Sequence, residues 1–287
     1  MRAMGTPDPP GTLYLAPTPI GNLEDITLRT LRVLRGARLI LAEDTRTTGR
    51  LLAHHGISAP LLSYTEHNHE ARIARILESL DEGDVVLVSE AGMPGINDPG
   101  QALVARAVAA GVRVVGLPGA SAVPLAVAVS GLPMRAFTFI GFLPHGRGDR
   151  LAVLRRHAAA GPALVCFETP HRLAAALADI ADVFGERPLA VCREMTKLHE
   201  EVFRGTATEA VTYFVQPRGE FTLVIGGSDG PAVDGPSPDE LTAFLRERAA
   251  EGLSARDAVG AAVARFGTPR RAVYSAWEAL KAQSGAS

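Results

Sequence analysis

The sequence has few cysteines and almost no lysine. Cys166 and Cys192 are its two cysteines, and both lie in apolar runs without the spacing of metal ligands. This pattern is typical of reduced thiols in the core of a cytoplasmic protein, and it excludes a disulfide framework. Lysine occurs only at Lys197 and Lys281, among 29 basic residues. Because arginine does not release its proton in proteins, a lysine kept in such a chain indicates a group that shares or loses one.

Long apolar runs and a large net charge are also missing. No run reaches the ~20 residues that a membrane helix needs. Residues 1–11 lack the apolar centre of a signal peptide, so we expect a short flexible leader there. The formal net charge of −2 gives no overall signature of nucleic-acid binding, so any basic surface must be local. The 287 residues and the hydrophobic content of 47% predict two domains with a large core.

A predicted strand, a loop rich in proline and glycine, and a helix repeat along the first half of the chain. The clearest example is residues 84–100, where the apolar run at 85–88 ends in the loop SEAGMPGINDPG. Similar loops follow the predicted strands 12–16 and 112–116. This alternation predicts an α/β fold with a mostly parallel sheet, in which ligands bind beyond the carboxyl ends of the strands. No loop matches G-x-G-x-x-G or G-x-x-x-x-G-K-[ST], which disfavours ordinary dinucleotide and nucleoside-triphosphate sites.

The pattern changes near residues 132–136, where we place a domain boundary. We predict an N-terminal α/β domain at 12–134 and a second α/β domain, with a mixed sheet, at 135–228. Residues 229–238 have the composition of a linker, and residues 239–287 are predicted to form a small tail of three short helices. The spacing within this tail is like that of a helix-turn-helix, although a plain helical appendage is an equal alternative.

Six motifs occur in an order that indicates a family. They are APTPIGNLED at 16–25, AEDTR at 42–46, SEAGMPGINDPG at 89–100, PGASA at 118–122, ETPHR at 168–172 and CREMTK at 192–197. Together they resemble the tetrapyrrole methylase superfamily. Within it, the chain is similar to the bacterial enzymes that methylate a ribose 2′-hydroxyl of a cytidine in 16S ribosomal RNA of the small subunit. The resemblance covers about residues 12–227, and residues 237–282 resemble the helix-turn-helix tail of the same group.

The resemblance implies two α/β domains with S-adenosyl-L-methionine in the cleft between them. It also implies a cytoplasmic homodimer that acts on 16S rRNA or the 30S subunit. Where the superfamily commonly has Gly-Asp-Pro, this chain has Gly92-Met93-Pro94, so we expect backbone groups of residues 92–96 to hold the methyl donor instead of an acid. The donor-pocket positions that the resemblance implies are Pro17, Gly92, Met93, Pro94, Ile96, Ser121, Ala122, Phe167, Met195 and Thr222.

Methyl transfer to a ribose hydroxyl requires alignment of the two reacting centres and a base, but no metal ion. Lys197 is our first candidate for the base, because the chain has kept it in a motif. Asp44 could instead form a structural ion pair with Arg46. The carboxylates that compete with Lys197 for the catalytic role are Glu43, Asp44, Glu90 and Glu194.

Loops at the rim of the predicted cleft carry side chains that suit contacts to RNA phosphates, although each of them, taken alone, is more typical of solvated surface. His67 and His69 are two apart on a predicted helix and would point to different faces, so we expect no metal site there. The candidate RNA contacts are Arg46, His67, Asn68, Arg147, Arg150, His171, Arg172 and Arg193.

The sequence also leaves room for alternative functions. A small-molecule methyltransferase acting on a tetrapyrrole would share the fold, but the tail and the basic segment 147–156 favour RNA. A non-catalytic RNA-binding assembly factor could keep the fold without binding S-adenosylmethionine. A nicotinamide dehydrogenase is disfavoured, because the chain lacks its phosphate-binding loop.

Overall fold

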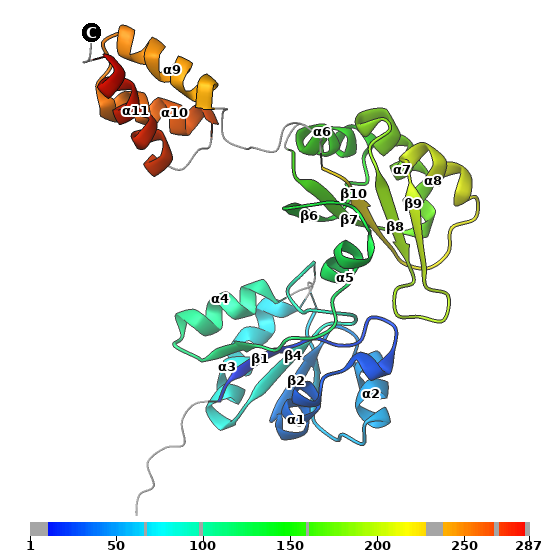
Figure 1. The fold of residues 1–287 in the computed structure, drawn as a ribbon. Helices are drawn as coiled ribbons and strands as arrows, with labels where there is room; N and C mark the ends of the chain where they lie inside the picture. The colour runs from blue at the N-terminus through cyan, green and yellow to red at the C-terminus, as the bar shows by residue number, and fades with distance from the viewer. Residues whose placement is uncertain are drawn as a thin grey trace, which may run out of the picture. The chain divides into compact units, whose positions relative to one another are not determined.

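The computed structural model describes residues 11–65, 68–97, 100–158, 161–227, 238–266 and 270–284. The chain forms two compact units, residues 1–228 and 229–287 (Figure 1). The predicted leader, apart from Gly11, and the predicted linker, apart from Pro238, lie outside the described residues. None of the described helices combines the length and the apolar character that crossing a lipid bilayer requires.

The first sheet of the larger unit is parallel throughout. Its strand order is β3-β2-β4-β1-β5, so the strands before the three Pro/Gly loops, β4, β1 and β5, are neighbours. Parallel pairing places the carboxyl ends of these strands at one edge. The bounds are β1 (Leu13–Ala16), β2 (Leu39–Ala42), β3 (Leu61–Ser63), β4 (Val85–Val88) and β5 (Val114–Gly116).

Helices cover both faces of this sheet, which explains why β2 and β4 are apolar and buried along their whole length. Helices α1 (Leu28–Gly36) and α2 (Thr45–His54) pack on the face that carries Val86. Helices α3 (His69–Glu82) and α4 (Gln101–Ala109) pack on the face that carries Leu87. The predicted α/β fold with a parallel sheet is confirmed.

The second sheet is mixed, as its hairpin-like end predicted. Its strand order is β6-β7-β10-β8-β9; β6 and β7 are parallel, and the other neighbours are antiparallel. Helices α6 (Arg147–Ala158), α7 (Pro170–Phe184) and α8 (Ala207–Tyr213) cover one face. The strands are β6 (Phe137–Phe142), β7 (Ala163–Glu168), β8 (Leu189–Arg193), β9 (Glu201–Gly205) and β10 (Phe221–Ile225).

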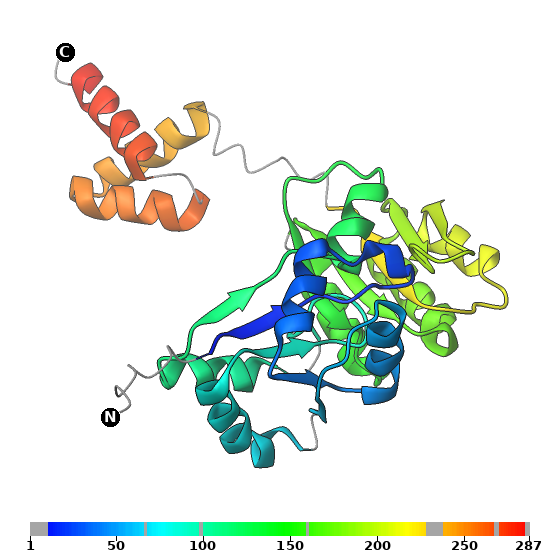
Figure 2. The ribbon, with the colours of Figure 1, turned by 90° about the horizontal axis from the view of Figure 1, so that it is seen from below.

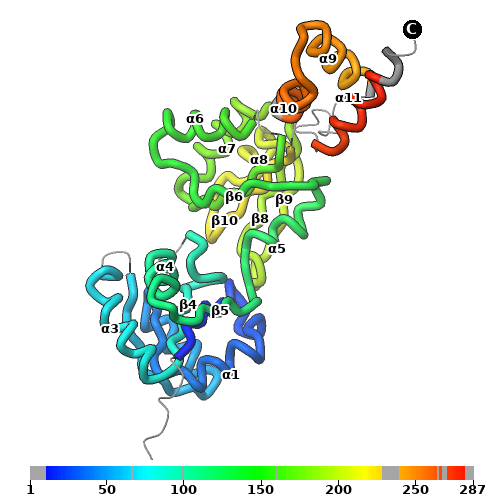
Figure 3. The backbone as a smooth tube through the Cα atoms, turned by 90° about the vertical axis from the view of Figure 1, so that its left-hand side faces the viewer, coloured from blue at the N-terminus to red at the C-terminus, as the bar shows by residue number. Residues whose placement is uncertain are grey.

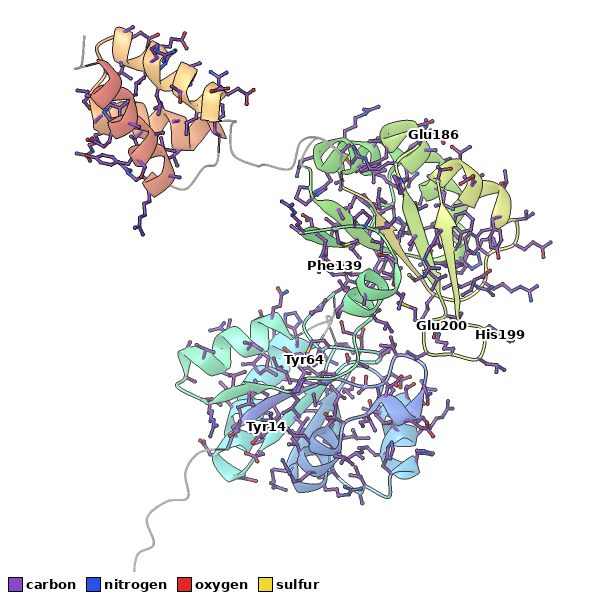
Figure 4. The ribbon with its side chains drawn as sticks, in the orientation of Figure 1. Tyr14, Tyr64, Phe139, Glu186, His199 and Glu200 are labelled. Carbon is purple, nitrogen blue, oxygen red and sulfur yellow. The ribbon has the colours of Figure 1, made fainter. Side chains whose placement is uncertain are left out.

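Helix α5 (Ala122–Val129) follows β5 of the first sheet but packs on the free face of the second (Figures 1 and 3). Its sequence, AVPLAVAV, is apolar on every side, so it can be covered all round. Val123 and Ala126 are buried against Val165 and Val224, and Phe139 of β6 lies in the same layer (Figure 4). The helix therefore joins the two sheets and keeps the loop after β5 beside the second one.

The smaller unit is a bundle of three helices, drawn from orange to red in Figure 2. They are α9 (Pro238–Ala250), α10 (Ala255–Phe266) and α11 (Arg270–Ser284). Leu245, Val259, Val273 and Trp277 form its core. Ser254 accepts a hydrogen bond from the Asp257 backbone N–H and caps α10, whereas Thr268 lies outside the described residues. Three helices are present, and the helix-turn-helix character stays a prediction.

A buried carboxylate ties α6 to α7 in the second half of the larger unit. Asp179 is 2% exposed, and its two oxygens accept hydrogen bonds at 2.8 Å from Arg147 Nε and Arg150 Nε. Arg147 also reaches the exposed Asp182 at 3.2 Å. Burial raises the pKa of Asp179, but the two guanidinium groups outweigh it and leave the pKa below its ordinary value. Two of the arginines in the basic segment 147–156, Arg147 and Arg150, therefore pair with carboxylates within the fold, whereas Arg155 and Arg156 are exposed.

We expect Asp179→Asn to lower the free energy of unfolding by about 3–5 kcal/mol, because it leaves the buried Arg150 without its charged partner. The matched control Asp182→Asn removes the exposed partner and should cost less than about 1 kcal/mol. Urea denaturation of both variants measures the difference. Equal losses of unfolding free energy in the two variants would show that the burial of Asp179 does not increase its contribution to stability.

Candidate functional site

The loops after β1 and β4 are joined at the carboxyl edge of the first sheet. The Thr18 N–H donates to the Gly92 carbonyl oxygen at 3.0 Å, and the Gly92 N–H donates to the Thr18 carbonyl at 3.0 Å. The Ser89 hydroxyl donates to the same Gly92 oxygen, and the Thr18 hydroxyl donates to the Ser89 carbonyl at 3.0 Å. Both hydrogen-bonding groups of the Gly92 backbone are thus used within the protein. A donor molecule held by this loop must use other backbone groups than those of Gly92.

A cavity of about 390 Å³ opens beside this joint, between the loops of the first sheet and the end of the second. A volume of this size is typical of small-molecule sites. Of the predicted donor positions, the residues that line it are Gly92, Met93, Ile96, Ser121, Ala122, Phe167 and Thr222.

Three predicted donor positions, Pro17, Pro94 and Met195, do not line the cavity. Met195 is buried in the layer between α5 and the second sheet, where Ile20 also lies. Pro17 packs on Gly119, where a Cβ atom would come within 2.9 Å of the Pro17 Cβ. Pro94 lies in the loop after β4 but is not part of the wall.

Eleven lining residues were not among the predicted site residues, and those at the ends of β7 and β10 come together only through strand pairing. β7 and β10 are antiparallel, with Glu168 opposite Phe221 and Phe167 opposite Thr222, so the end of one strand lies beside the start of the other. Phe142 joins them through an edge-to-face contact with Phe167 at 5.5 Å between ring centroids. The lining residues missed from sequence are Ile20, Ala91, Asn97, Val123, Phe142, Glu168, Thr169, Pro170, Gly219, Glu220 and Phe221.

The polar part of the wall is acidic. Glu90, Glu168 and Glu220 line the cavity, and no lysine or arginine is found among its described lining residues. Burial raises the pKa of Glu90 above its ordinary value, and the nearby charges of Glu43, Asp44 and Glu220 raise it further. Glu168 is 2% exposed; one oxygen accepts the Thr169 N–H at 2.8 Å, and the other lies 3.2 Å from Arg172 Nη2. Such a wall attracts cations.

Lys197 lies next to this wall and holds two carboxylates. Its Nζ donates to Glu194 at 2.8 Å and to Glu220 at 3.0 Å, and the Glu220 N–H also donates to Glu194. Burial lowers the pKa of Lys197, but its bonds to Glu194 and Glu220 outweigh this and raise it overall. A lysine with a raised pKa stays protonated at neutral pH and is poorly suited to accept a proton. An ammonium held by two carboxylates suits a positioning role, and the assignment of Lys197 as the base stays a prediction.

Backbone strain is concentrated around the same residues. Asn97, Glu194 and Thr196 have φ angles of 62°, 50° and 66°, and they are the non-glycine residues with positive φ in the described part of the chain. The loop that carries Glu194 and Thr196 presses on Gly21, where a Cβ atom would lie 2.4 Å from Lys197 Cγ. Residues in such conformations persist where surrounding contacts hold them, often at functional sites.

Asp44 has a structural task. Its carboxylate accepts the Arg46 backbone N–H at 2.8 Å and the Thr47 hydroxyl at 3.0 Å, and so caps α2. The bond from the Arg46 N–H, helped by Thr47, lowers the pKa of Asp44. Among the described side chains no ion pair joins Asp44 to Arg46, so the cap replaces the ion pair that we considered. Glu43 precedes the cap, and its charge acts on Glu90.

The predicted RNA contacts separate into engaged and exposed groups. Arg150 is buried on Asp179, Arg147 is shared between Asp179 and Asp182, and Arg172 donates to the Leu143 and Pro144 carbonyls. The engaged group also includes Arg193, which bonds to Glu201 and to the Arg218 carbonyl, and Asn68, whose side chain accepts the Thr65 N–H. Arg46 and His171 are exposed.

His67 lies outside the described residues. Within the part of the chain that the structure describes, no three His, Cys, Asp or Glu side chains are grouped as they would be around a metal ion.

The two joined sheets and the cavity at their strand ends define an α/β protein with a cavity at the carboxyl edge of its parallel sheet. The chain belongs to the family of Tetrapyrrole (Corrin/Porphyrin) Methylases, whose profile matches residues 12–211. The family resemblance of the sequence motifs is confirmed.

Curated relatives span nearly the whole chain. Ribosomal RNA small subunit methyltransferase I of Halalkalibacterium halodurans is 41% identical over 278 residues, 93% of this chain and 95% of that protein. The protein of the same name from Synechocystis is 42% identical over 268 residues, which make up 92% of this chain and 96% of that protein. That of Thermotoga maritima is 48% identical over 222 residues, which make up 76% of this chain and 100% of that protein.

Solved structures share the fold at low sequence identity. Cobalt precorrin-4 methyltransferase superposes with a TM-score of 0.58 at 19% identity, covering 75% of this chain and 94% of that one. Uroporphyrin III C-methyltransferase from Thermus thermophilus superposes with a TM-score of 0.53 at 20% identity. The match covers 75% of this chain and 97% of that one. At this identity the likeness concerns the fold alone.

We expect Lys197→Met to lower the free energy of unfolding at neutral pH by about 1–2 kcal/mol, because it removes the ion pair with Glu194. The ion pair with the exposed Glu220 should contribute little to this loss. The pKa of Glu194 is lowered in the folded state: burial raises it, but the bonds from Lys197 and the Glu220 N–H outweigh that. Its stabilising contribution is therefore complete above its ordinary pKa and is lost as the pH falls through the lowered value.

Urea denaturation at pH 7 and in acid tests this prediction. The gap between wild type and Lys197→Met should close in acid, whereas the exposed control Lys281→Met should behave like wild type at both pH values. A gap of the same size in acid would rule out the carboxylate network as its source.

Proposed function

We propose that this protein is an S-adenosylmethionine-dependent methyltransferase that methylates a ribose 2′-hydroxyl of a cytidine in the 16S RNA of the small ribosomal subunit. The relatives that are 41% to 48% identical over most of the chain carry the corresponding name. A cytoplasmic homodimer is the expected setting. The Thermotoga relative is matched over its full length by 76% of this chain, which supports placing the reaction in the larger unit, residues 1–228.

The observation that carries the proposal is the acidic, aromatic wall of the cavity. S-adenosylmethionine has a positive sulfonium and a positive ammonium group, which suit carboxylates and oppose nearby lysine or arginine. Glu90, Glu168 and Glu220 provide the carboxylates, and Phe142 and Phe167 provide flat apolar surface for adenine. Met93, in the place of the acid common in the superfamily, leaves the acidic contacts to these other positions. The residues present therefore fit the donor.

When bound, S-adenosylmethionine supplies a methyl carbon on a positively charged sulfur, which a ribose oxygen attacks as the sulfur leaves. The protein must take up the hydroxyl proton, because a ribose hydroxyl is far too weak an acid at neutral pH. We assign this task to Glu90. Its carboxylate lines the donor cavity, and its raised pKa brings its basicity closer to that of an effective general base. Within the described residues, none donates a hydrogen bond to the Glu90 carboxylate.

Lys197 acts on Glu220 and Glu194 in this scheme. By holding both carboxylates at 2.8 Å and 3.0 Å, its ammonium fixes Glu220 in the cavity wall and offsets part of the negative charge near Glu90. It is a positioning residue in this assignment, and its Cγ lies against Gly21.

A labelled-methyl assay separates this function from its alternatives. The donor, carrying a labelled methyl group, is incubated with 30S subunits from cells that lack the enzyme, and the RNA is then hydrolysed in alkali. A 2′-O-methyl group blocks cleavage at its own nucleotide, so we expect the label in an alkali-resistant dinucleotide that begins with cytidine. Label on a tetrapyrrole precursor instead would favour the small-molecule methyltransferase. RNA binding without donor binding in calorimetry would favour the assembly factor.

Glu90→Gln should lower kcat by about 10²–10⁴-fold, because the amide cannot accept the proton, and should weaken S-adenosylmethionine binding far less, because Glu168 and Glu220 remain in the wall. In the wild type, kcat should fall as the pH drops through the raised pKa of Glu90, since only the deprotonated carboxylate is active.

The matched control is Glu78→Gln, an exposed position on α3. Turnover of Glu90→Gln equal to that of this control would remove Glu90 from the mechanism.

A further inference from the structure

A second, smaller hollow adjoins the donor cavity. It measures about 190 Å³ and lies between the loop after β1, the short 3₁₀ helix η1 (Leu23–Asp25) and the first turns of α2. Glu90 lines both this hollow and the donor cavity. A group seated here therefore reaches the same carboxylate as a molecule in the larger cavity.

The walls of the hollow are partly apolar and partly polar. Pro19, Leu51 and Leu23 form the apolar part, and the Leu23 side chain is 43% exposed although it is a large hydrophobic residue. Thr48 also lines the hollow and is 4% exposed, and its hydroxyl forms no hydrogen bond with another described residue. A flat ring with polar edges fits such a hollow, because its faces meet apolar walls and its edge meets a free hydroxyl.

The rim supplies the one positive charge of the hollow. Arg50 is exposed and, among the described side chains, forms no ion pair. Glu43 and Asp44 act on Glu90 from the same side, which opposes a free anion deep in the hollow. A phosphate is accommodated only at the rim, next to Arg50. This distribution of charge matches one nucleotide, with its neutral ring and sugar inside and its phosphate outside.

We propose that this hollow is the subsite for the acceptor nucleotide of the RNA, a single unpaired pyrimidine nucleotide. Its ring lies against Leu23 and Pro19, its ribose faces Glu90, and its 5′ or 3′ phosphate meets Arg50. A volume of about 190 Å³ suits one pyrimidine nucleoside and is half that of the donor cavity, at about 390 Å³. The proposal rests on the proposed function, and it adds which part of the surface selects the substrate.

Two pairs of variants test the subsite. Leu23→Ala removes the stacking wall, and Arg50→Gln removes the rim charge. Leu28→Ala and Arg32→Gln are their controls; these residues lie on α1, are exposed, and do not line the hollow. Each protein is measured for methyl transfer to 30S subunits, for donor binding by calorimetry, and for binding of a short 16S RNA fragment with one unpaired cytidine. The RNA binding is measured by fluorescence anisotropy with S-adenosylhomocysteine present.

We expect Leu23→Ala to weaken RNA binding and raise the KM for 30S subunits by about 5- to 30-fold, because it removes apolar contact between the Leu23 side chain and the ring. Arg50→Gln should make the dependence of log Kd on log salt shallower by about 0.7, the value for one phosphate contact to a single strand. Donor binding should not change, and both controls should match wild type.

Variants that bind RNA like their controls overturn the subsite, as does an equal loss of donor binding, which would assign the hollow to the donor. If wild type binds the RNA and the donor without methyl transfer, the proposed function fails. The RNA-binding measurements then still decide the subsite, because they do not depend on turnover. A wild-type protein that does not bind the RNA overturns both.

Discussion

The pair of backbone hydrogen bonds between Thr18 and Gly92 is the contact on which the rest of the site depends. It joins the loops of two neighbouring parallel strands, and Ser89 strengthens it by donating to the same Gly92 oxygen. Because the loops are joined, Ile20 is carried against α5, and Gly21 against the strained loop that contains Lys197. Glu90 follows directly after Ser89, so its position between the two cavities depends on the same joint.

Charge is distributed around this joint in a way that serves a cationic ligand. The cavity wall holds carboxylates, Lys197 pairs with Glu194 and Glu220, and Arg147 and Arg150 of α6 pair with Asp179. The same distribution raises the pKa of Glu90, since the carboxylates that attract a cation also repel a charge on Glu90. Donor binding and proton uptake thus share one electrostatic cause in the proposed mechanism.

Sequence patterns predicted the fold better than the contacts of individual side chains. Three Pro/Gly loops after apolar strands placed the site at one sheet edge, and their strands are indeed neighbours. Seven lining residues were among the predicted donor positions, whereas Glu168, Glu220 and the two aromatic residues Phe142 and Phe221 were missed. The arginines at 147 and 150 looked like a basic RNA loop, because the sequence does not show that Asp179, about thirty residues later, lies beneath them. Lys197 was the first candidate for the base because the sequence does not show that its ammonium contacts Glu194 and Glu220.

By itself, the sequence determined the alternation of strands and helices, the apolar strands that must be buried on both faces, and the motifs that mark the family. These are local properties: each depends on residues a few positions apart. The tertiary structure alone decided that α5 leaves its own sheet to cover the second one, and that the antiparallel pairing of β7 with β10 brings Glu168 beside Phe221. It also decided which charged side chains form ion pairs, such as Arg150 with Asp179 and Lys197 with Glu194. Such choices depend on the register and packing of segments far apart in the chain, and no local pattern encodes them.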